Sequence, residues 1–423
     1  MTNDADSRTM DRSGFVKVAA GAGVAAAVPL VSARKAGAAS GIPVKVGVMT
    51  ASGASYEGMG KSLLDGLQLG FDDARTGASP VAATLTTASV ERGYGGALST
   101  ARGLLDGGAD VVVANVSAPV AQRLASLFAD RQASLVVADV GAHVVQPAAR
   151  NPFVLHNSLL YWHGSFALGQ WAAANLGNRG FVAACLSDAG YDTVYAFRRG
   201  FESAGGSIVG DRVTHADPAH AGLPELLAAV QASGANVLYG LYSGAHAAEF
   251  VQAYASSGLG AKLAVGSLAV EDYLLGAVGS AALGATSCAS WTATRAARAN
   301  QTFTKAFKSR YGRSADPFAA LGYDTASLVA QGAARAVKNG LGLRRLIEAL
   351  SGASIDGPRG TLTVDAASNT VTGPLFVRQV KRSSGVLANY DVASAPSVGA
   401  FPDALAALAS GPLSGYVNEY LCA

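Results

Sequence analysis

The chain has little charge, little cysteine and few long apolar runs. Charged residues make up 14% of its 423 residues, and the formal net charge is +3. It contains no basic run of the kind that binds nucleic acid, so we expect no nucleic-acid partner. Three cysteines are too few for a disulfide scaffold, although Cys288 and Cys422 could pair in an oxidising compartment. After residue 40, no uninterrupted apolar run is long enough to cross a membrane.

Sequence patterns of the common enzyme and metal sites are also missing. The six histidines show no HExxH spacing, and GLYSG (240–244) has its serine one place late for the GxSxG of hydrolases. The segment SYEGMGKS (55–62) has almost the layout of a phosphate-binding P-loop, but Ser55 stands where that loop requires glycine. We therefore expect no catalytic residues, no metal and no cofactor, and keep an exported enzyme as an alternative.

The first 38 residues have the order of an export signal. Basic residues precede the apolar segment 18–33, and small residues at positions 36 and 38 follow it. The first cysteine, Cys185, lies too far from this segment to carry a lipid anchor. We expect a periplasmic protein that is not a lipoprotein, exported by either the general or the twin-arginine route.

From residue 42 onward, short apolar strands alternate with amphipathic helices. In the first stretch the pattern predicts strands at 44–49, 82–88, 110–116 and 134–140. This alternation is typical of a doubly wound parallel sheet. It begins again at residue 163 with about four further strand–helix units, so we expect a second sheet and a second lobe.

The C-terminal third has a different pattern. Helices are predicted at 299–312, 317–340 and 343–350. Two strands, 357–365 and 373–381, are expected to pair as a small hairpin. After residue 387 the chain is rich in Ala, Pro and Ser, with one short predicted helix at 402–410.

Candidate ligand contacts follow the predicted strands, because open α/β sheets bind ligands at the carboxyl ends of their strands. Ser117 is a good helix N-cap, and a helix start at Ala118 would offer free N–H groups to a carboxylate. Gly141 and Ala142 follow the next strand and would let the backbone approach a ligand closely. In the second lobe aromatic residues follow the strands and suggest a lined cleft: Tyr161, Trp162, Tyr191 and Tyr242.

These segments, in this order, resemble the type I periplasmic solute-binding proteins of ABC transporters, a group that includes the leucine/isoleucine/valine-binding protein. The resemblance covers residues 42 to about 386. It rests on VKVGVMTASGASYEGMG with LLDGLQLGFDDA, on NVSAPVAQ, on SDAGYDTVYAFRRGFESAGGSIVGD, on LGYDTASLVAQGA and on GPRGTLTVDAASNTVTGPLFVRQV. The order and spacing of these segments, more than any one motif, indicate the family.

The resemblance implies two doubly wound parallel-sheet lobes joined by a three-crossover hinge. The expected division is an export signal (1–38), an N-terminal lobe (42–158 plus 290–353), a C-terminal lobe (159–289 plus 354–386) and an extension (387–423). By the same resemblance, ligand contacts fall at Tyr56, Ser117, Ala118, Gly141, Ala142, Tyr191, Tyr242 and Ser267.

One departure from the family bears on the ligand. Amino-acid binders of the family often place an acid at the position of Ser267 or Leu268, or in the segment NSLLYWHG, and this chain has none at these positions. An unpaired ammonium group in a closed cleft is costly. Either the ligand lacks a free α-amino group, or Asp139 or Asp188 supplies the acid.

The resemblance implies a monomeric receptor that captures a small organic solute, amino-acid-like or a small carboxylate or amide, and presents it to a membrane permease. A small carboxylate with an apolar or aromatic body is the ligand subtype we favour. A sensory receptor with the same fold is the other alternative besides an exported enzyme.

Overall fold

The computed structural model of the protein describes residues 41–51, 58–90, 94–145, 151–186, 191–215, 217 and 222–396. The expected export signal, Tyr56, Asp188, the expected helix at 402–410 and Cys422 lie outside the described residues. No helix within the described ranges is both long and apolar enough to span a membrane.

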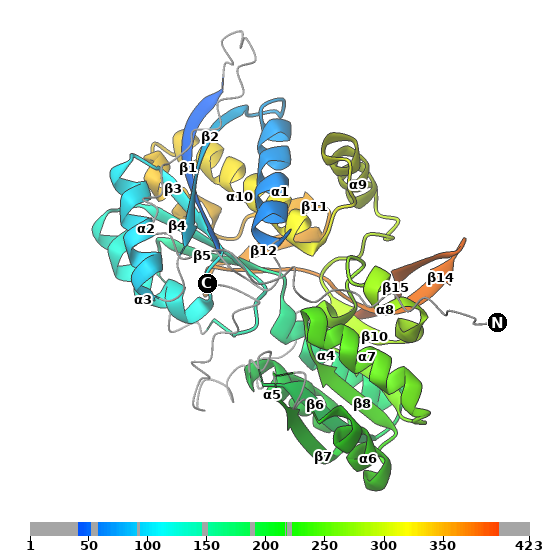
Figure 1. Cartoon of the computed structure of the whole chain (residues 1–423). Helices are drawn as coiled ribbons and strands as arrows, with labels where there is room; N and C mark the ends of the chain where they lie inside the picture. Colours follow the sequence, from blue (N-terminus) through cyan, green and yellow to red (C-terminus); the bar gives the residue numbers. More distant parts are fainter. Residues whose placement is uncertain are drawn as a thin grey trace, which may run out of the picture. The chain divides into compact units, whose positions relative to one another are not determined.

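The first lobe is built on an eight-stranded sheet in the order β11-β12-β13-β5-β4-β3-β1-β2 (Figure 1). Its strands are β1 (Ile42–Ala51), β2 (Val81–Val90), β3 (Val111–Ala114), β4 (Ser134–Asp139), β5 (Val154–Ser158), β11 (Ser354–Gly357), β12 (Gly360–Asp365) and β13 (Thr370–Thr372). Strands β1 to β5 pair in parallel, whereas β12 runs antiparallel to both its neighbours.

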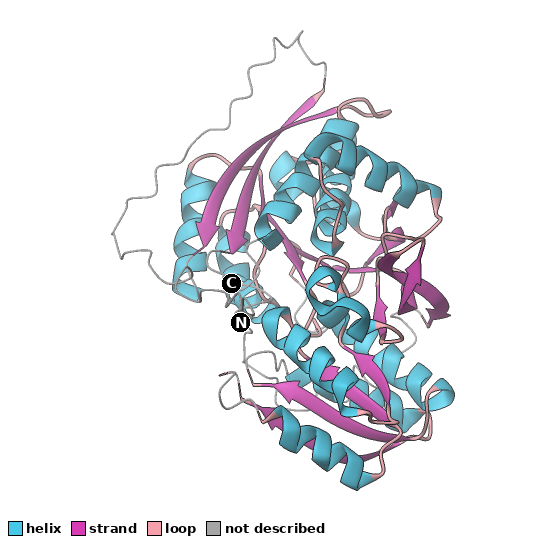
Figure 2. Ribbon diagram, turned by 45° about the vertical axis from the view of Figure 1, so that its right-hand side comes forward, coloured by secondary structure: helices cyan, strands magenta, loops and turns pink. Residues whose placement is uncertain are grey.

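Helices cover both faces of this sheet (Figure 2). They are α1 (Gly58–Ala74), α2 (Tyr94–Asp106), α3 (Ala118–Asp130) and α10 (Pro317–Lys338), with α9 (Arg298–Tyr311) packed outside α1 and α10. Because both faces are covered, β3 and β4 are buried along their whole length and show no polar alternation. Their apolar run is the pattern from which the sequence predicted a parallel sheet.

The second lobe is built on a seven-stranded sheet in the order β15-β14-β10-β9-β8-β6-β7. Its strands are β6 (Arg179–Cys185), β7 (Ser207–Thr214), β8 (Val237–Leu241), β9 (Lys262–Val265), β10 (Thr286–Ala289), β14 (Leu375–Ser383) and β15 (Val386–Ala395). Its helices are α4 (Tyr161–Asn175), α5 (Tyr191–Ser203), α6 (Leu223–Ser233), α7 (Gly244–Ser257), α8 (Leu275–Val278) and the 3₁₀ turns η4 (Ser267–Val270) and η5 (Gly279–Ala282). Strands β6 to β10 pair in parallel, and β14 and β15 are antiparallel additions.

The chain passes between the two sheets after β5, after β10 and after β13. This confirms the two-lobed fold with three crossovers. Arg359 stabilises the start of the first crossover, at the end of β5. Its guanidinium lies 2.6 Å from the Asp324 carboxylate and 2.5 Å from the Ser158 carbonyl oxygen. Both side chains of this ion pair are fully buried.

Some expected local structures differ from the observed ones. The strands at 357–365 and 373–381 do not form a hairpin, because β12 pairs with β11 and β13 in the first sheet while β14 pairs with β10 and β15 in the second. Segment 354–372 therefore lies in the first sheet, although the expected division placed it in the C-terminal lobe, and β15 lies where the extension was expected. A strand pattern fixes the faces of a strand but not its partner.

The segment 343–350 was expected to be a helix and instead forms the two 3₁₀ turns η6 (Leu343–Arg345) and η7 (Glu348–Leu350). It lies between Gly342 and Gly352, and so short a segment gains little from helix propagation.

Candidate ligand-binding site

The start of α3 presents a buried hydroxyl group for which the described residues supply no partner. Ser117 follows β3 and has extended backbone angles (φ −67°, ψ 154°) at the N-cap position. Its side chain is fully buried, yet its hydroxyl does not cap the helix, and Oγ has no hydrogen-bond partner among the described residues. A buried hydroxyl without a partner costs about 1–3 kcal/mol. Ser117 is therefore a candidate for a hydrogen bond to a ligand.

The loop after β4 turns sharply at Gly141. This glycine has φ +71°, and a Cβ atom there would lie 2.5 Å from Ser158 Oγ, so no larger residue fits. The turn lets the Gly141 amide donate to the buried carboxylate of Asp139, whose pKa burial raises to about 7. It also directs His143, two residues later, towards the second lobe.

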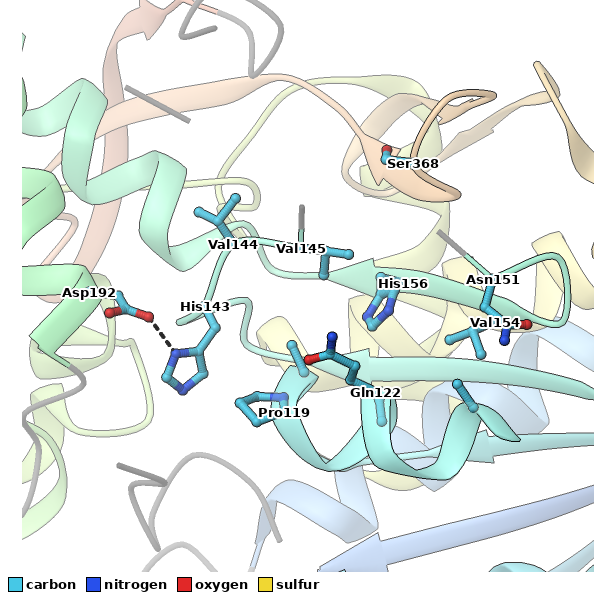
Figure 3. Close-up of a pocket in the computed structure, with 13 residues that line it drawn as sticks. Pro119, Gln122, His143, Val144, Val145, Asn151, Val154, His156, Asp192 and Ser368 are labelled. Carbon is cyan, nitrogen blue, oxygen red and sulfur yellow. Dashed lines mark hydrogen bonds and ion pairs between the residues drawn. The ribbon is translucent and has the colours of Figure 1, made fainter. Parts of the chain in front are cut away.

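His143 and Asp192 join the two lobes. The distance between His143 Nδ1 and Asp192 Oδ2 is 2.6 Å, and the two side chains are only 8% and 7% exposed (Figure 3). Asp192 lies in the first turn of α5, where a carboxylate is favoured by the helix dipole. Beside it, the Thr193 hydroxyl lies 3.4 Å from the Ala142 carbonyl oxygen. The loop after β4 thus packs against the start of α5.

A pocket of about 90 Å³ begins at this contact and runs along α3. This is several times the space that one water molecule needs, roughly 10–15 Å³. The lining residues come from α3, the segment after β4, β5, the loop before β13 and α5: Ala118, Pro119, Ala121, Gln122, Ala125, His143, Val144, Val145, Asn151, Val154, His156, Asp192 and Ser368. Figure 3 shows His143 and Asp192 at one end of the set and His156, Asn151 and Ser368 towards the other. Burial lowers the pKa of His156 to about 4.

The two aromatic residues that open α4 are buried next to the first crossover. The Tyr161 hydroxyl packs against Gly266, where a Cβ atom would lie 2.3 Å away from it. Trp162 is fully buried and stacks on Phe166, and its indole Nε1 has no partner in the part of the chain that the structure describes. Trp162, like Ser117, offers a buried polar atom for a ligand or water.

The remaining predicted contacts of the second lobe have different surroundings. Tyr191 opens α5 next to Asp192. Tyr242 lies in the core of the second lobe, where its ring stacks on Phe250 at 4.1 Å and its hydroxyl lies 3.1 Å from Thr214 Oγ1. The Ser267 carbonyl oxygen accepts a hydrogen bond from Arg378 at 3.0 Å. Tyr242 and Ser267 are not among the residues that line the pocket.

The structure therefore brings Ala118 to the pocket and places Ser117 and Ala142 directly beside its lining residues. It adds His143 and Asp192, which the sequence did not single out. Each is the neighbour of a predicted contact, but only the Gly141 turn and the packing of α5 show that the two side chains meet. Among the described residues, no group of three or more His, Cys, Asp or Glu side chains is arranged to hold a metal ion.

Comparison with known proteins identifies the family that has this architecture. A family model described as periplasmic binding protein matches residues 43–385. An ABC transporter substrate-binding protein from Sphaerobacter thermophilus has a similar structure, with a TM-score of 0.76, 24% identity and coverage of 84% of this chain and 98% of that one. No curated protein matches the chain.

Two further solved structures are similar. A solute binding protein of an ABC transporter from R. palustris, in complex with benzoate, has a TM-score of 0.69 and 23% identity over 84% of this chain and 97% of that one. A leucine binding protein from Thermotoga maritima has a TM-score of 0.67 and 17% identity over 85% of this chain and 99% of that one. At these identities the likeness concerns the fold.

Proposed function

The chain belongs to the periplasmic binding protein family, and we propose that it is the solute-binding receptor of an ABC-type uptake transporter with a small carboxylate as its ligand. The observation that carries the choice of ligand is the start of α3. Ser117 holds there a hydroxyl that has no partner among the described residues, at the positive dipole end of the helix. This arrangement suits a carboxylate.

The acids near the site support a ligand without a free α-amino group. Asp192 is already engaged by His143 at 2.6 Å. Burial raises the pKa of Asp139 to about 7, so its carboxyl group carries only part of a negative charge near neutral pH. Neither acid is a ready counter-charge for an ammonium group. Pro119, Val144 and Val145 offer apolar contacts to an apolar or aromatic body.

Capture would proceed by hinge closure. The ligand contacts the first lobe through the start of α3, and the start of α5 approaches from the second lobe. We propose Ser117, Ala118, Gly141, Ala142, Tyr161, Trp162 and Tyr191 as the ligand-contacting set, with Tyr56 in the loop before α1. The closed form would be presented to a membrane permease, with no chemical step. We further propose that the protein acts as a monomer in the periplasm after removal of residues 1–38.

Matched ligands test this proposal. A thermal-shift experiment should compare leucine with 4-methylpentanoate, which is leucine without its amino group, and should include benzoate and 4-hydroxybenzoate. A ligand at a hundredfold excess over its Kd stabilises the folded state by about 2.7 kcal/mol, which raises the melting temperature by several degrees. We expect the acids to give this rise and leucine to give less. A larger rise with leucine would refute the ligand class, and no rise with any acid would refute the carboxylate receptor.

A further inference from the structure

The contact between His143 and Asp192 engages one of the two nitrogens of the imidazole. A carboxylate only accepts hydrogen bonds, so His143 Nδ1 carries the proton that lies between the two groups. The other ring nitrogen, Nε2, lies on the opposite side of the ring (Figure 3). It is an acceptor when the imidazole is neutral and a donor when the imidazole is protonated.

A cationic side chain would strengthen the binding of a carboxylate at the start of α3, and the described lining offers few. It contains neither Lys nor Arg, and its two histidines are His143 and His156. Burial lowers the pKa of His156 to about 4, which keeps that ring neutral near pH 7. Among the described residues, the charged groups that face His143 are the carboxylates of Asp192 on α5 and Asp139 on β4. His143 is thus the lining side chain best placed to meet an anion.

We propose that His143 is the specificity-determining residue for the ligand carboxylate, to which it donates a hydrogen bond from Nε2 as an imidazolium ion. Asp192 balances the charge of the imidazolium from the second lobe. This inference rests on the proposed function, because it specifies how the same site selects a carboxylate.

Two consequences follow from this arrangement. A neutral His143 would turn a lone pair towards the ligand carboxylate, so binding at alkaline pH requires the uptake of one proton. In addition, the ligand stabilises the imidazolium, and a charge-assisted hydrogen bond to Asp192 is stronger than a neutral one. Ligand binding and the contact between the lobes therefore reinforce each other.

Proton uptake can be measured on the unmodified protein. Titration calorimetry with benzoate or 4-methylpentanoate, in phosphate and in Tris across pH 6–9, reports the number of protons bound with each ligand. We expect this number to approach one at the alkaline end, where the affinity should fall towards tenfold per pH unit. His143→Gln should abolish the component of proton uptake that His143 carries and weaken binding at pH 7 at least tenfold.

Three variants separate His143 from its neighbours. Asp139→Asn removes the other group that titrates near the ligand, and proton uptake should persist in this variant. Asp192→Asn should reduce the affinity for the acid. His246→Gln, on α7 and outside the pocket, is the matched histidine control and should behave as the unmodified protein.

The results that overturn this inference differ from those that overturn the receptor proposal. If an acid binds without proton uptake at any pH, or binds His143→Gln with unchanged affinity, His143 does not select the carboxylate although the receptor proposal stands. If none of the acids binds, both fail. If His143→Gln does not fold, the proton count on the unmodified protein decides the question alone.

Discussion

Replacing Ser117 by alanine should move stability and affinity in opposite directions. An N-cap serine usually contributes about 0.5–2 kcal/mol through its bond to the helix, but Ser117 makes no such bond. Within the described part of the chain, its buried hydroxyl instead has no hydrogen-bond partner. We therefore expect Ser117→Ala to leave the free energy of unfolding unchanged or to raise it by up to about 1 kcal/mol.

The affinity for the acid should fall in the same variant. A hydrogen bond from a hydroxyl to a charged carboxylate contributes about 1.5–3 kcal/mol, which corresponds to a loss of roughly ten- to a hundredfold in affinity. Urea unfolding without ligand gives the stability, and titration calorimetry with 4-methylpentanoate or benzoate gives the affinity.

Ser134 offers a matched control for this variant. It is also fully buried, but its hydroxyl donates to the Arg344 carbonyl oxygen at 2.8 Å. Ser134→Ala should lose about 1 kcal/mol of stability and leave the affinity unchanged. A Ser117→Ala protein that loses stability as Ser134→Ala does, and binds the acid normally, would refute the assignment of Ser117 as a ligand contact.

Three further predictions concern the scaffold. Asp324→Asn leaves the Arg359 guanidinium buried without a carboxylate, and urea unfolding should show a loss of about 3 kcal/mol. Gly322→Ala would place a Cβ atom 2.1 Å from a carbonyl oxygen of α1 and should lower the free energy of unfolding by about 2 kcal/mol. Gly276→Ala is the control, because a Cβ atom there would have no atom within 4 Å, and it should leave the stability unchanged. Equal losses in the two variants would contradict the close packing of α1 on α10. Burial lowers the pKa of His163 to about 4 from 6.5, so the folded state binds fewer protons than the unfolded state between these values and stability falls as pH drops through this window. His163→Gln should recover about 1–2 kcal/mol of that loss at pH 5. If the urea unfolding curves show the same difference in stability between pH 7 and pH 5 for this variant and for the unmodified protein, the prediction is wrong.

The sequence predicted the parallel core well, because a strand that is buried on both faces is an uninterrupted apolar run. Strands β3 and β4 are short apolar runs followed by helices, and a parallel sheet is the architecture that covers such strands. The partners of the later strands were not predictable in this way. The residues of 357–365 do not reveal that this segment pairs with β13, and those of 373–381 do not reveal that it pairs with β10. Both pairings depend on where the third crossover lies.

In the site, too, some features could be predicted from local sequence and others could not. Ser117 was recognisable because its residue type and its place before Pro119 are typical of a helix start. Tyr242 was expected at the cleft because it follows a strand. The alternation along β8, however, places it on the same face as Leu238, in the core beneath α7. The contact of His143 with Asp192 depends on a positive φ at Gly141 and on contact between the lobes. A local sequence pattern predicts neither of these.

The most direct test of the account is a crystal structure of the protein with 4-methylpentanoate or benzoate. We expect one carboxylate oxygen to lie about 2.7–3.2 Å from Ser117 Oγ, with His143 Nε2 in contact with the same carboxylate and the start of α5 closed over it. An acid that is bound elsewhere, or whose carboxylate points away from α3 into solvent, would contradict the account.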